Sequence, residues 1–72
     1  MQEKVYIVVS QHRIIAVYKT DLQAKMRTYR ENQLLLQQDH YPKKKELDNL
    51  WNSVQQPCNS DNEFYWQSFI LE

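Results

Sequence analysis

The sequence predicts an α/β fold of the α+β type, in which a three-stranded, mostly antiparallel sheet carries two packed helices. Three observations predict it. Two β-branched and aromatic runs stand near the N-terminus, two segments with helical periodicity follow, and an aromatic run closes the chain. The expected order is therefore a β-hairpin, a long helix, a short helix and a C-terminal strand. Because the chain has 72 residues, we expect one small domain over residues 1–72.

The first two expected strands form a hairpin. Residues 5–10 (VYIVVS) and residues 14–18 (IIAVY) have the composition of strands, and only three polar residues separate them. Such a short connection favours antiparallel pairing. Successive side chains of a strand point to opposite faces of the sheet. In both runs, apolar residues occupy the positions that point to one face and those that point to the other. Both faces of each strand are therefore expected to be apolar.

A long helix is expected over residues 21–38. Thr20 suits the N-cap, because its hydroxyl can accept a hydrogen bond from a first-turn N–H, and Gln23 completes a capping-box pattern. An apolar stripe follows at helical spacing, and we expect it to be the buried face. The stripe comprises Leu22, Met26 and Tyr29, and continues through Gln33 to Leu36.

A shorter helix is expected after Pro42. Proline disfavours helical geometry at the residue before it and suits the first position of a helix, so Pro42 is expected to end one helix and open the next. A polar loop over residues 56–62 then leads into the last strand, residues 64–71 (FYWQSFIL). The buried face of this second helix is predicted by single-face spacing of Leu47, Leu50, Trp51 and Val54.

Composition narrows the classes of function. The chain has no glycine, which excludes phosphate-cradling loops, the dinucleotide fingerprint and the usual nucleophile elbow. Nine basic and nine acidic groups give a net charge of zero, which argues against a generally basic nucleic-acid coat. Residues 1–45 hold nine basic and four acidic groups, whereas residues 46–72 hold five acidic groups and no Lys or Arg. This asymmetry can mark a charged partner, but we favour two parts that lie together and cancel.

The sequence has no pattern typical of a catalytic or metal centre. Cys58 is the one cysteine and lies in a polar loop without nearby cations, so neither a disulfide nor a reactive thiol is expected. His12 and His40 fall in expected turns, and Asp39, His40 and Asp48 match no metal-site spacing. We therefore expect a protein that is not an enzyme and uses no cofactor.

The expected compartment is the reducing cytoplasm. A single cysteine is typical of intracellular proteins, and the N-terminus lacks the pattern of a signal peptide. No apolar run approaches the roughly 18 residues that a membrane span needs, so no membrane partner is expected.

A surplus of apolar sheet surface predicts a second chain. All three expected strands are apolar on both faces, whereas two helices can cover hardly more than one face. We therefore expect another protein or a second copy of this chain, as a homodimer, on the second face. Tyr65 and Phe69 are the expected aromatic anchors there. The alternative is that the two helices take opposite faces and leave a self-sufficient monomer.

A second candidate surface is basic and lies where the two helices are expected to meet. Its lysines would steer the encounter with a protein partner and make binding salt-sensitive. The alternative function is a nucleic-acid-binding accessory protein that uses the basic stretch from Lys25 to Lys45, although the sequence pI of 6.7 counts against it. The residues of this surface are Arg27, Arg30, Tyr41, Lys43, Lys44 and Lys45.

Three stretches also carry a family resemblance: residues 4–10 (KVYIVVS), 14–24 (IIAVYKTDLQA) and 64–72 (FYWQSFILE). In these stretches the chain resembles a set of small, mostly uncharacterised phage and bacterial proteins with a strand-strand-helix-strand outline. Residues 34–62 depart from that outline. The resemblance implies no catalytic residues. It implies a protein that binds a host protein in the host cytoplasm, in some cases as an inhibitor of antiviral defence.

Overall fold

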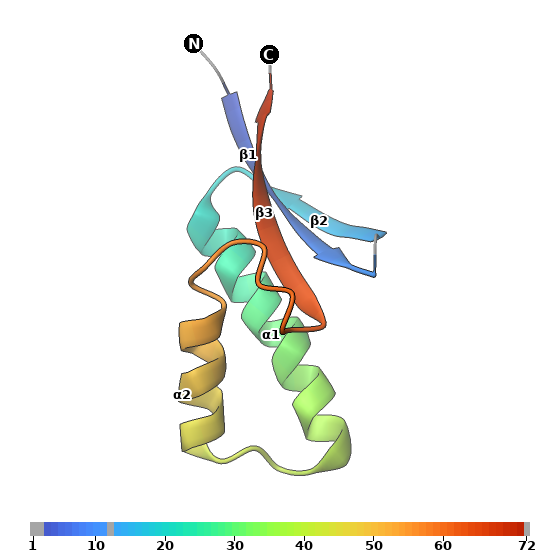
Figure 1. Ribbon diagram of the computed structural model, residues 1–72, viewed down its shortest axis with the longest axis vertical. Coiled ribbons are helices and arrows are strands. Elements are labelled where there is room, and N and C mark those ends of the chain that lie inside the picture. The colour runs from blue at the N-terminus through green and yellow to red at the C-terminus, as the bar shows by residue number, and fades with distance from the viewer. Residues whose placement is uncertain (1–2, 12, 72) are drawn as a thin grey trace.

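The computed structural model describes residues 3–11 and 13–71. His12, expected in the hairpin turn, and Glu72, the last residue of the third resembling stretch, lie outside the described residues. The expected order of elements and the fold class are confirmed, with the strands in the order β2-β1-β3 and both pairs antiparallel (Figure 1). The elements are β1 (Glu3–Ser10), β2 (Arg13–Tyr18), α1 (Asp21–Asp39), α2 (Lys44–Ser53) and β3 (Phe64–Leu71).

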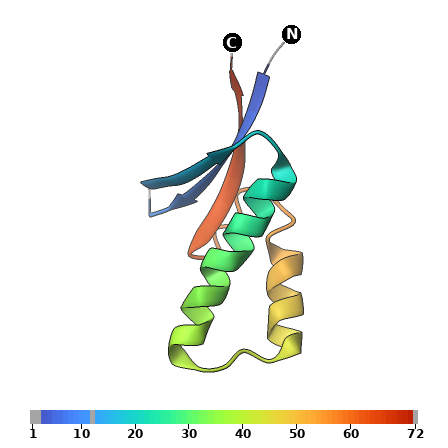
Figure 2. The same ribbon diagram turned by 180° about the vertical axis from the view of Figure 1, so that it is seen from behind.

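Both helices lie on the same side of the sheet (Figure 1; Figure 2). α1 packs against all three strands, whereas α2 packs against α1 and contacts none of the three described strands. The alternative in which the helices take opposite faces is therefore wrong. β1 and β3 run on past the helices, so both ends of the chain lie at one end of an elongated molecule of 45 × 21 × 16 Å.

The core between α1 and the sheet is small. Val8 from β1, Ala24 from α1 and Trp66 from β3 are its buried residues. The side chain of Ala24 ends at Cβ, so the helix approaches β1 closely, and both Ala24 and Val8 are fully buried. Tyr6 and Tyr18 pack around this cluster. The sheet face that carries Val8 and Trp66 is thus the face that α1 covers.

The face of α1 that packs on the sheet is not the expected one. Its buried residues are Ala24, Thr28 and Asn32, whereas Leu22 and Met26 of the expected stripe are more than half exposed. The buried polar side chains form hydrogen bonds to the main chain of α1. The Thr28 hydroxyl donates to Ala24 O at 2.8 Å, and the Asn32 amide donates to Thr28 O at 2.9 Å. The apolar stripe instead lies along the side of α1 that faces α2.

α1 begins where the sequence predicts. The N–H of Gln23 donates to Thr20 Oγ1 at 3.3 Å, and the Thr20 hydroxyl donates to Gln23 Oε1 at 3.1 Å. Asp21 lies in the first turn, where a negative charge is favourable, and pairs with Lys25 Nζ at 3.5 Å. The helix ends at Asp39, one residue later than expected.

Pro42 does not open the second helix. α2 begins at Lys44, with Lys43 as its N-cap. The Glu46 carboxylate accepts a hydrogen bond from the Lys43 N–H at 3.5 Å. A negative charge in the first turn is favourable, and it offsets the unfavourable position of the neighbouring lysines.

The first part of the outer edge of β3 bonds to groups from α1 and from the loop before β3. The side-chain amide of Asn32 donates to Phe64 O at 2.9 Å, and Asn32 Oδ1 accepts from the Phe64 N–H at 3.1 Å. Two residues further on, Trp66 O accepts from the Cys58 N–H at 2.7 Å. The indole Nε1 of Trp66 donates to Val54 O at 2.6 Å. These bonds fix the start of β3 to the helical layer.

Replacing Asn32 by leucine should lower the free energy of unfolding by about 2–4 kcal/mol. The change removes both bonds to Phe64 and leaves a part-buried N–H and a part-buried carbonyl without partners. Urea unfolding of both proteins measures the difference. Gln37→Leu is the control, because Gln37 is exposed on the same helix and its replacement should change stability by less than about 0.5 kcal/mol. Equal losses in the two variants would contradict the prediction.

Candidate functional site

The sheet face turned away from α1 is mainly apolar. Strand pairing places Val9 opposite Tyr65 and Val5 opposite Phe69. These positions alternate with Val8 and its partners, so their side chains project from the opposite face. Gln67, opposite Ile7, and Glu3, opposite Leu71, are the polar residues among them. We call this surface the open face; its apolar residues are Val5, Ile7, Val9, Ile14, Val17, Tyr65, Phe69 and Leu71.

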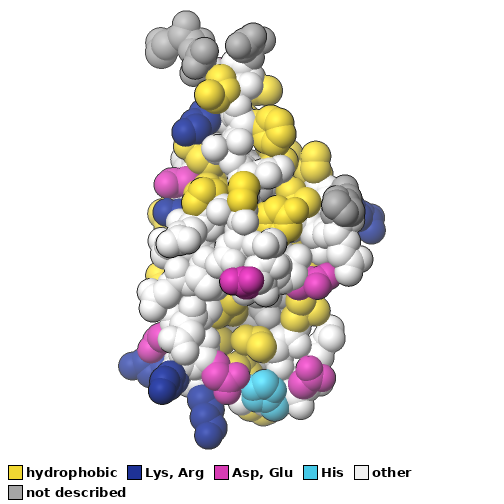
Figure 3. Space-filling view, in the orientation of Figure 1, with side chains coloured by type: hydrophobic (Ala, Val, Ile, Leu, Met, Phe, Trp, Pro, Cys, Tyr) yellow, Lys and Arg dark blue, Asp and Glu magenta, His cyan; other side chains and the backbone are white. Residues whose placement is uncertain are grey.

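The open face has a covered centre and an exposed rim. Ile7 and Val9 on the central strand are 7% and 6% exposed, because the side chains of the two neighbouring strands flank them. Phe69 on β3 is 51% exposed and Val17 on β2 is 57% exposed. Figure 3, which views the molecule from this side, shows hydrophobic side chains gathered over the strands, with most charged side chains lower down. Both expected anchors, Tyr65 and Phe69, therefore lie on this face.

The residues of the expected basic surface lie in two separate places. Arg27 and Arg30 stand in the middle of α1, and Arg30 precedes the last residue of the helix by nine positions, about 14 Å along the axis. Tyr41 lies in the connection between the helices and is 94% exposed. Lys43, Lys44 and Lys45 follow it at the start of α2 and are all exposed. The structure thus groups Tyr41 with the lysines and leaves the two arginines apart from them.

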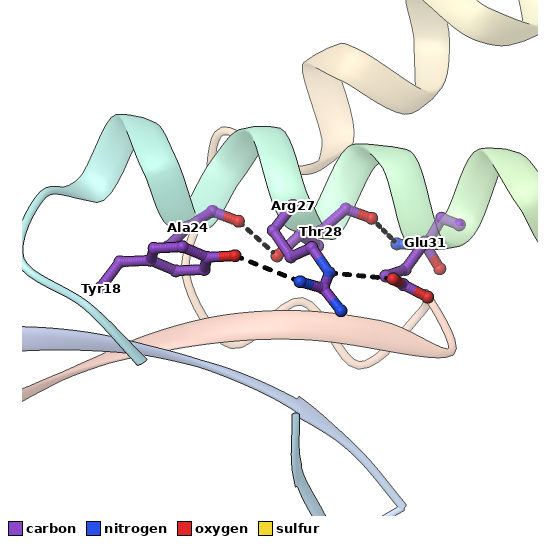
Figure 4. A network of polar contacts seen from close by, with 6 residues as sticks. Tyr18, Ala24, Arg27, Thr28 and Glu31 are labelled. Atoms are coloured by element: carbon purple, nitrogen blue, oxygen red, sulfur yellow. Dashed lines mark hydrogen bonds and ion pairs between the residues drawn. The ribbon is translucent and has the colours of Figure 1, made fainter. Parts of the chain in front are cut away.

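Arg27 is engaged within the fold (Figure 4). Its Nη1 donates to Tyr18 Oη at 3.3 Å, and its Nε donates to Glu31 Oε1 at 2.9 Å. The hydrogen bond with Tyr18 and then that with Glu31 raise the pKa of the Arg27 guanidinium above its ordinary value. Arg27 therefore ties α1 to the end of β2. Of the two arginines expected at the basic surface, Arg30 is the exposed one.

Among the described residues, no ion pair of a Lys or Arg joins the basic part of the chain, residues 1–45, to the acidic part, residues 46–72. Lys25 pairs with Asp21 and Arg27 with Glu31, both within α1. The Lys25 ammonium also lies 5.6 Å from the ring centroid of Trp66. Ion pairs of Lys or Arg therefore do not produce the expected cancellation of charge between these two parts. Two residues of the basic stretch considered for nucleic acid, Lys25 and Arg27, already have acidic partners.

A shallow groove of about 700 Å³ lies between α1 and α2. Its lining is mainly apolar, and the rings of Tyr29 and Trp51 meet edge to face in it with centroids 5.5 Å apart. Arg30 and Asp48 also line it, one from each helix. The apolar stripe of α1 is the sequence signal for this groove, but its periodicity does not state which neighbour the stripe faces. The apolar lining consists of Leu22, Met26, Tyr29, Leu47 and Trp51.

Residues 3–11 and 13–71 contain no group of three or more His, Cys, Asp or Glu side chains that could hold a metal ion. Cys58 is exposed, and its Sγ lies 3.5 Å from Gln67 Oε1. Within the same described part of the chain, no helix has the length and apolar character to cross a membrane.

Comparison with protein-family models, with curated proteins and with solved structures finds no match to this chain. The resemblance to small phage and bacterial proteins therefore stays a prediction. Function has to be argued from the geometry of the surfaces described above.

The contact between His40 and Glu46 at the start of α2 gives a titration prediction. His40 Nε2 lies 2.9 Å from Glu46 Oε2. The hydrogen bond with His40 is the main cause that holds the pKa of the Glu46 carboxyl below its ordinary value of 4.5, and the bond from the Lys43 N–H adds to it. Since the folded pKa lies below the unfolded one, the contact stabilises the fold above the unfolded pKa. This stabilisation is lost as the pH falls through the folded pKa.

Carboxyl-detected NMR should place the titration midpoint of Glu46 below 4.5. In His40→Ala the midpoint should move up toward that ordinary value, because the larger of the two hydrogen bonds is gone. An unchanged midpoint in the variant would contradict the assignment of this contact as the main cause.

Proposed function

We propose that the chain is a small, non-enzymatic protein-binding module and that the open face is its docking surface. The observation that carries the proposal is the placement of both helices on one side of the sheet, which leaves the second, mainly apolar face without a cover. Contiguous exposed apolar surface is costly in water and is typical of interaction sites.

The burial pattern of the open face suits docking. Ile7 and Val9 are already buried, so the centre of the surface is packed and excludes water before a partner binds. Phe69 and Val17 are more than half exposed, so a partner that removes them from water gains their transfer free energy. Aromatic side chains dominate many interfaces, and we therefore assign most of the affinity to Phe69 and Tyr65.

The basic residues take a secondary role in this proposal. Lys43, Lys44 and Lys45 are exposed at the end of the molecule where the helices join, away from the open face. At such a distance their charge acts on the rate of encounter with an acidic partner and is screened by salt. The aromatic anchors, in contrast, govern the dissociation rate.

A host protein is the partner we propose, and inhibition by surface occlusion is the proposed mode of action. The resemblance to small phage and bacterial proteins supports this assignment. The single-cysteine composition supports the cytoplasm as the compartment.

Site-specific photo-crosslinking in cells that encode the protein tests the proposal. p-Benzoylphenylalanine is placed at Tyr65 or Phe69 on the open face, and at Tyr41 in the helix connection as the matched control. We expect a discrete adduct with one protein at Tyr65 and at Phe69, and none at Tyr41, although Tyr41 is the most exposed of the three.

A second substitution makes the test specific for the open face. The adduct at Phe69 should disappear when Tyr65→Asp is introduced in the same chain, since a charge on the face opposes burial. Absence of adducts at both open-face positions would refute the proposed docking surface. Adducts of equal yield at Tyr41 would transfer the site to the helix connection.

A further inference from the structure

We propose that two copies of this chain pair through the free edge of β2 and form a continuous six-stranded antiparallel sheet. This interaction uses the main-chain edge of β2 and does not rest on the proposed function, although the side chain of Val17 belongs to the open face. The argument starts from the unequal treatment of the two edges of the sheet.

At the hairpin end of the sheet, the two outer strands present different kinds of edge. On β3, the main-chain groups of Phe64 bond to the Asn32 side chain, and Trp66 O bonds to the Cys58 N–H. On β2, one side pairs with β1, and no helix or loop of residues 3–11 and 13–71 lies along the other side (Figure 1; Figure 2). An unpaired strand edge is a template for the addition of another strand.

The bonds at the start of β3 also show which groups of β2 point outward. Because Trp66 O bonds outside the sheet, Trp66 and Val8 form a pair without mutual hydrogen bonds. Val8 must then direct its N–H and C=O toward its other neighbour, Ala16. The next residue on β2, Val17, therefore presents both its N–H and its C=O on the free side of the strand.

The free edge of β2 begins with a charged residue, Arg13, and the residues after it lack the charges and prolines that usually prevent strand addition. No proline and no charged side chain occur from Ile14 to Tyr18. Natural edge strands are commonly protected by such residues. Ile14 and Val17 are both more than half exposed. The one irregularity, a register shift that leaves Ile15 as an extra residue, lies toward the hairpin end, so Ala16 to Tyr18 remain regular.

A second copy is the occupant that fits this edge. Two identical strands pair in antiparallel fashion about a twofold axis, and each outward N–H then meets a carbonyl of the other copy. β-Branched side chains such as Ile14 and Val17 favour cross-strand contacts of this kind. With a net charge of zero, two copies do not repel each other at long range.

Light scattering during size-exclusion chromatography tests this pairing on the purified chain. We expect a mass of twice 8.8 kDa at high protein concentration, falling toward 8.8 kDa on dilution. Val17→Pro should give 8.8 kDa at every concentration, because proline removes the outward N–H of Val17 and leaves the β1–β2 bonds intact. Val17→Thr is the matched control, since threonine is also β-branched and retains the N–H, and it should keep the dimer.

Two further measurements make the outcome decisive. Far-UV circular dichroism checks that Val17→Pro is folded, and Val17→Lys replaces it if it is not, because an edge lysine also opposes strand addition. Phe69→Lys changes the open face at a distance from β2 and should leave the dimer mass unchanged. A parent mass of 8.8 kDa at all concentrations would overturn the proposal. It would also be overturned by a dimer that Phe69→Lys disrupts and Val17→Pro does not.

Discussion

The pairing of the Asn32 side chain with the main chain of Phe64 is the interaction on which the arrangement of this small protein depends. A carboxamide has one acceptor and an N–H donor in the geometry of a peptide group, so Asn32 acts toward β3 as a short stretch of neighbouring strand. Its second N–H bonds to Thr28 O at 2.9 Å, which leaves this buried amide fully satisfied. One side chain therefore ties α1 to the sheet and occupies the start of one sheet edge. A second face and a second edge are then left over, and the binding surfaces proposed for this protein are these two.

The fold was predictable where the signal is local. The N-cap at Thr20, the hairpin and the aromatic last strand each follow from a few neighbouring residues, and all three are present. The sheet-facing side of α1 was not predictable in this way. Ala24, Thr28 and Asn32 carry little hydrophobic signal, and they are buried because small size and complete hydrogen bonding suit a close helix–sheet contact. The apolar stripe had the right period for a buried face, but periodicity does not state which neighbour covers that face.

The difference between local signals and contacts between elements also explains why one candidate surface was predictable and the other was not. Tyr65 and Phe69 were placed correctly by strand alternation, which is a local rule, together with the small amount of helix available to cover the sheet. The basic surface was inferred from proximity along the chain. A helix carries residues apart by 1.5 Å at each step, so Arg30 and Lys44 are separated, and the use of Arg27 depends on Tyr18 of another element. Contacts between elements of this kind leave no trace in a single sequence.

Because the hydrophobic core is small, binding of a partner at the uncovered surfaces matters for the stability of the fold. Among the described residues, three buried hydrophobic side chains form the central cluster between α1 and the sheet, and a chain of this length buries a smaller fraction of its surface than a larger domain. A partner that binds only the folded state adds RT ln(1 + [L]/Kd) to the free energy of unfolding, where [L] is the free partner concentration. The two proposed contacts are geometrically compatible, because edge pairing about an axis perpendicular to the sheet leaves both open faces on the same side. Pairing of two copies would therefore widen the docking surface as well as stabilise the sheet that carries it.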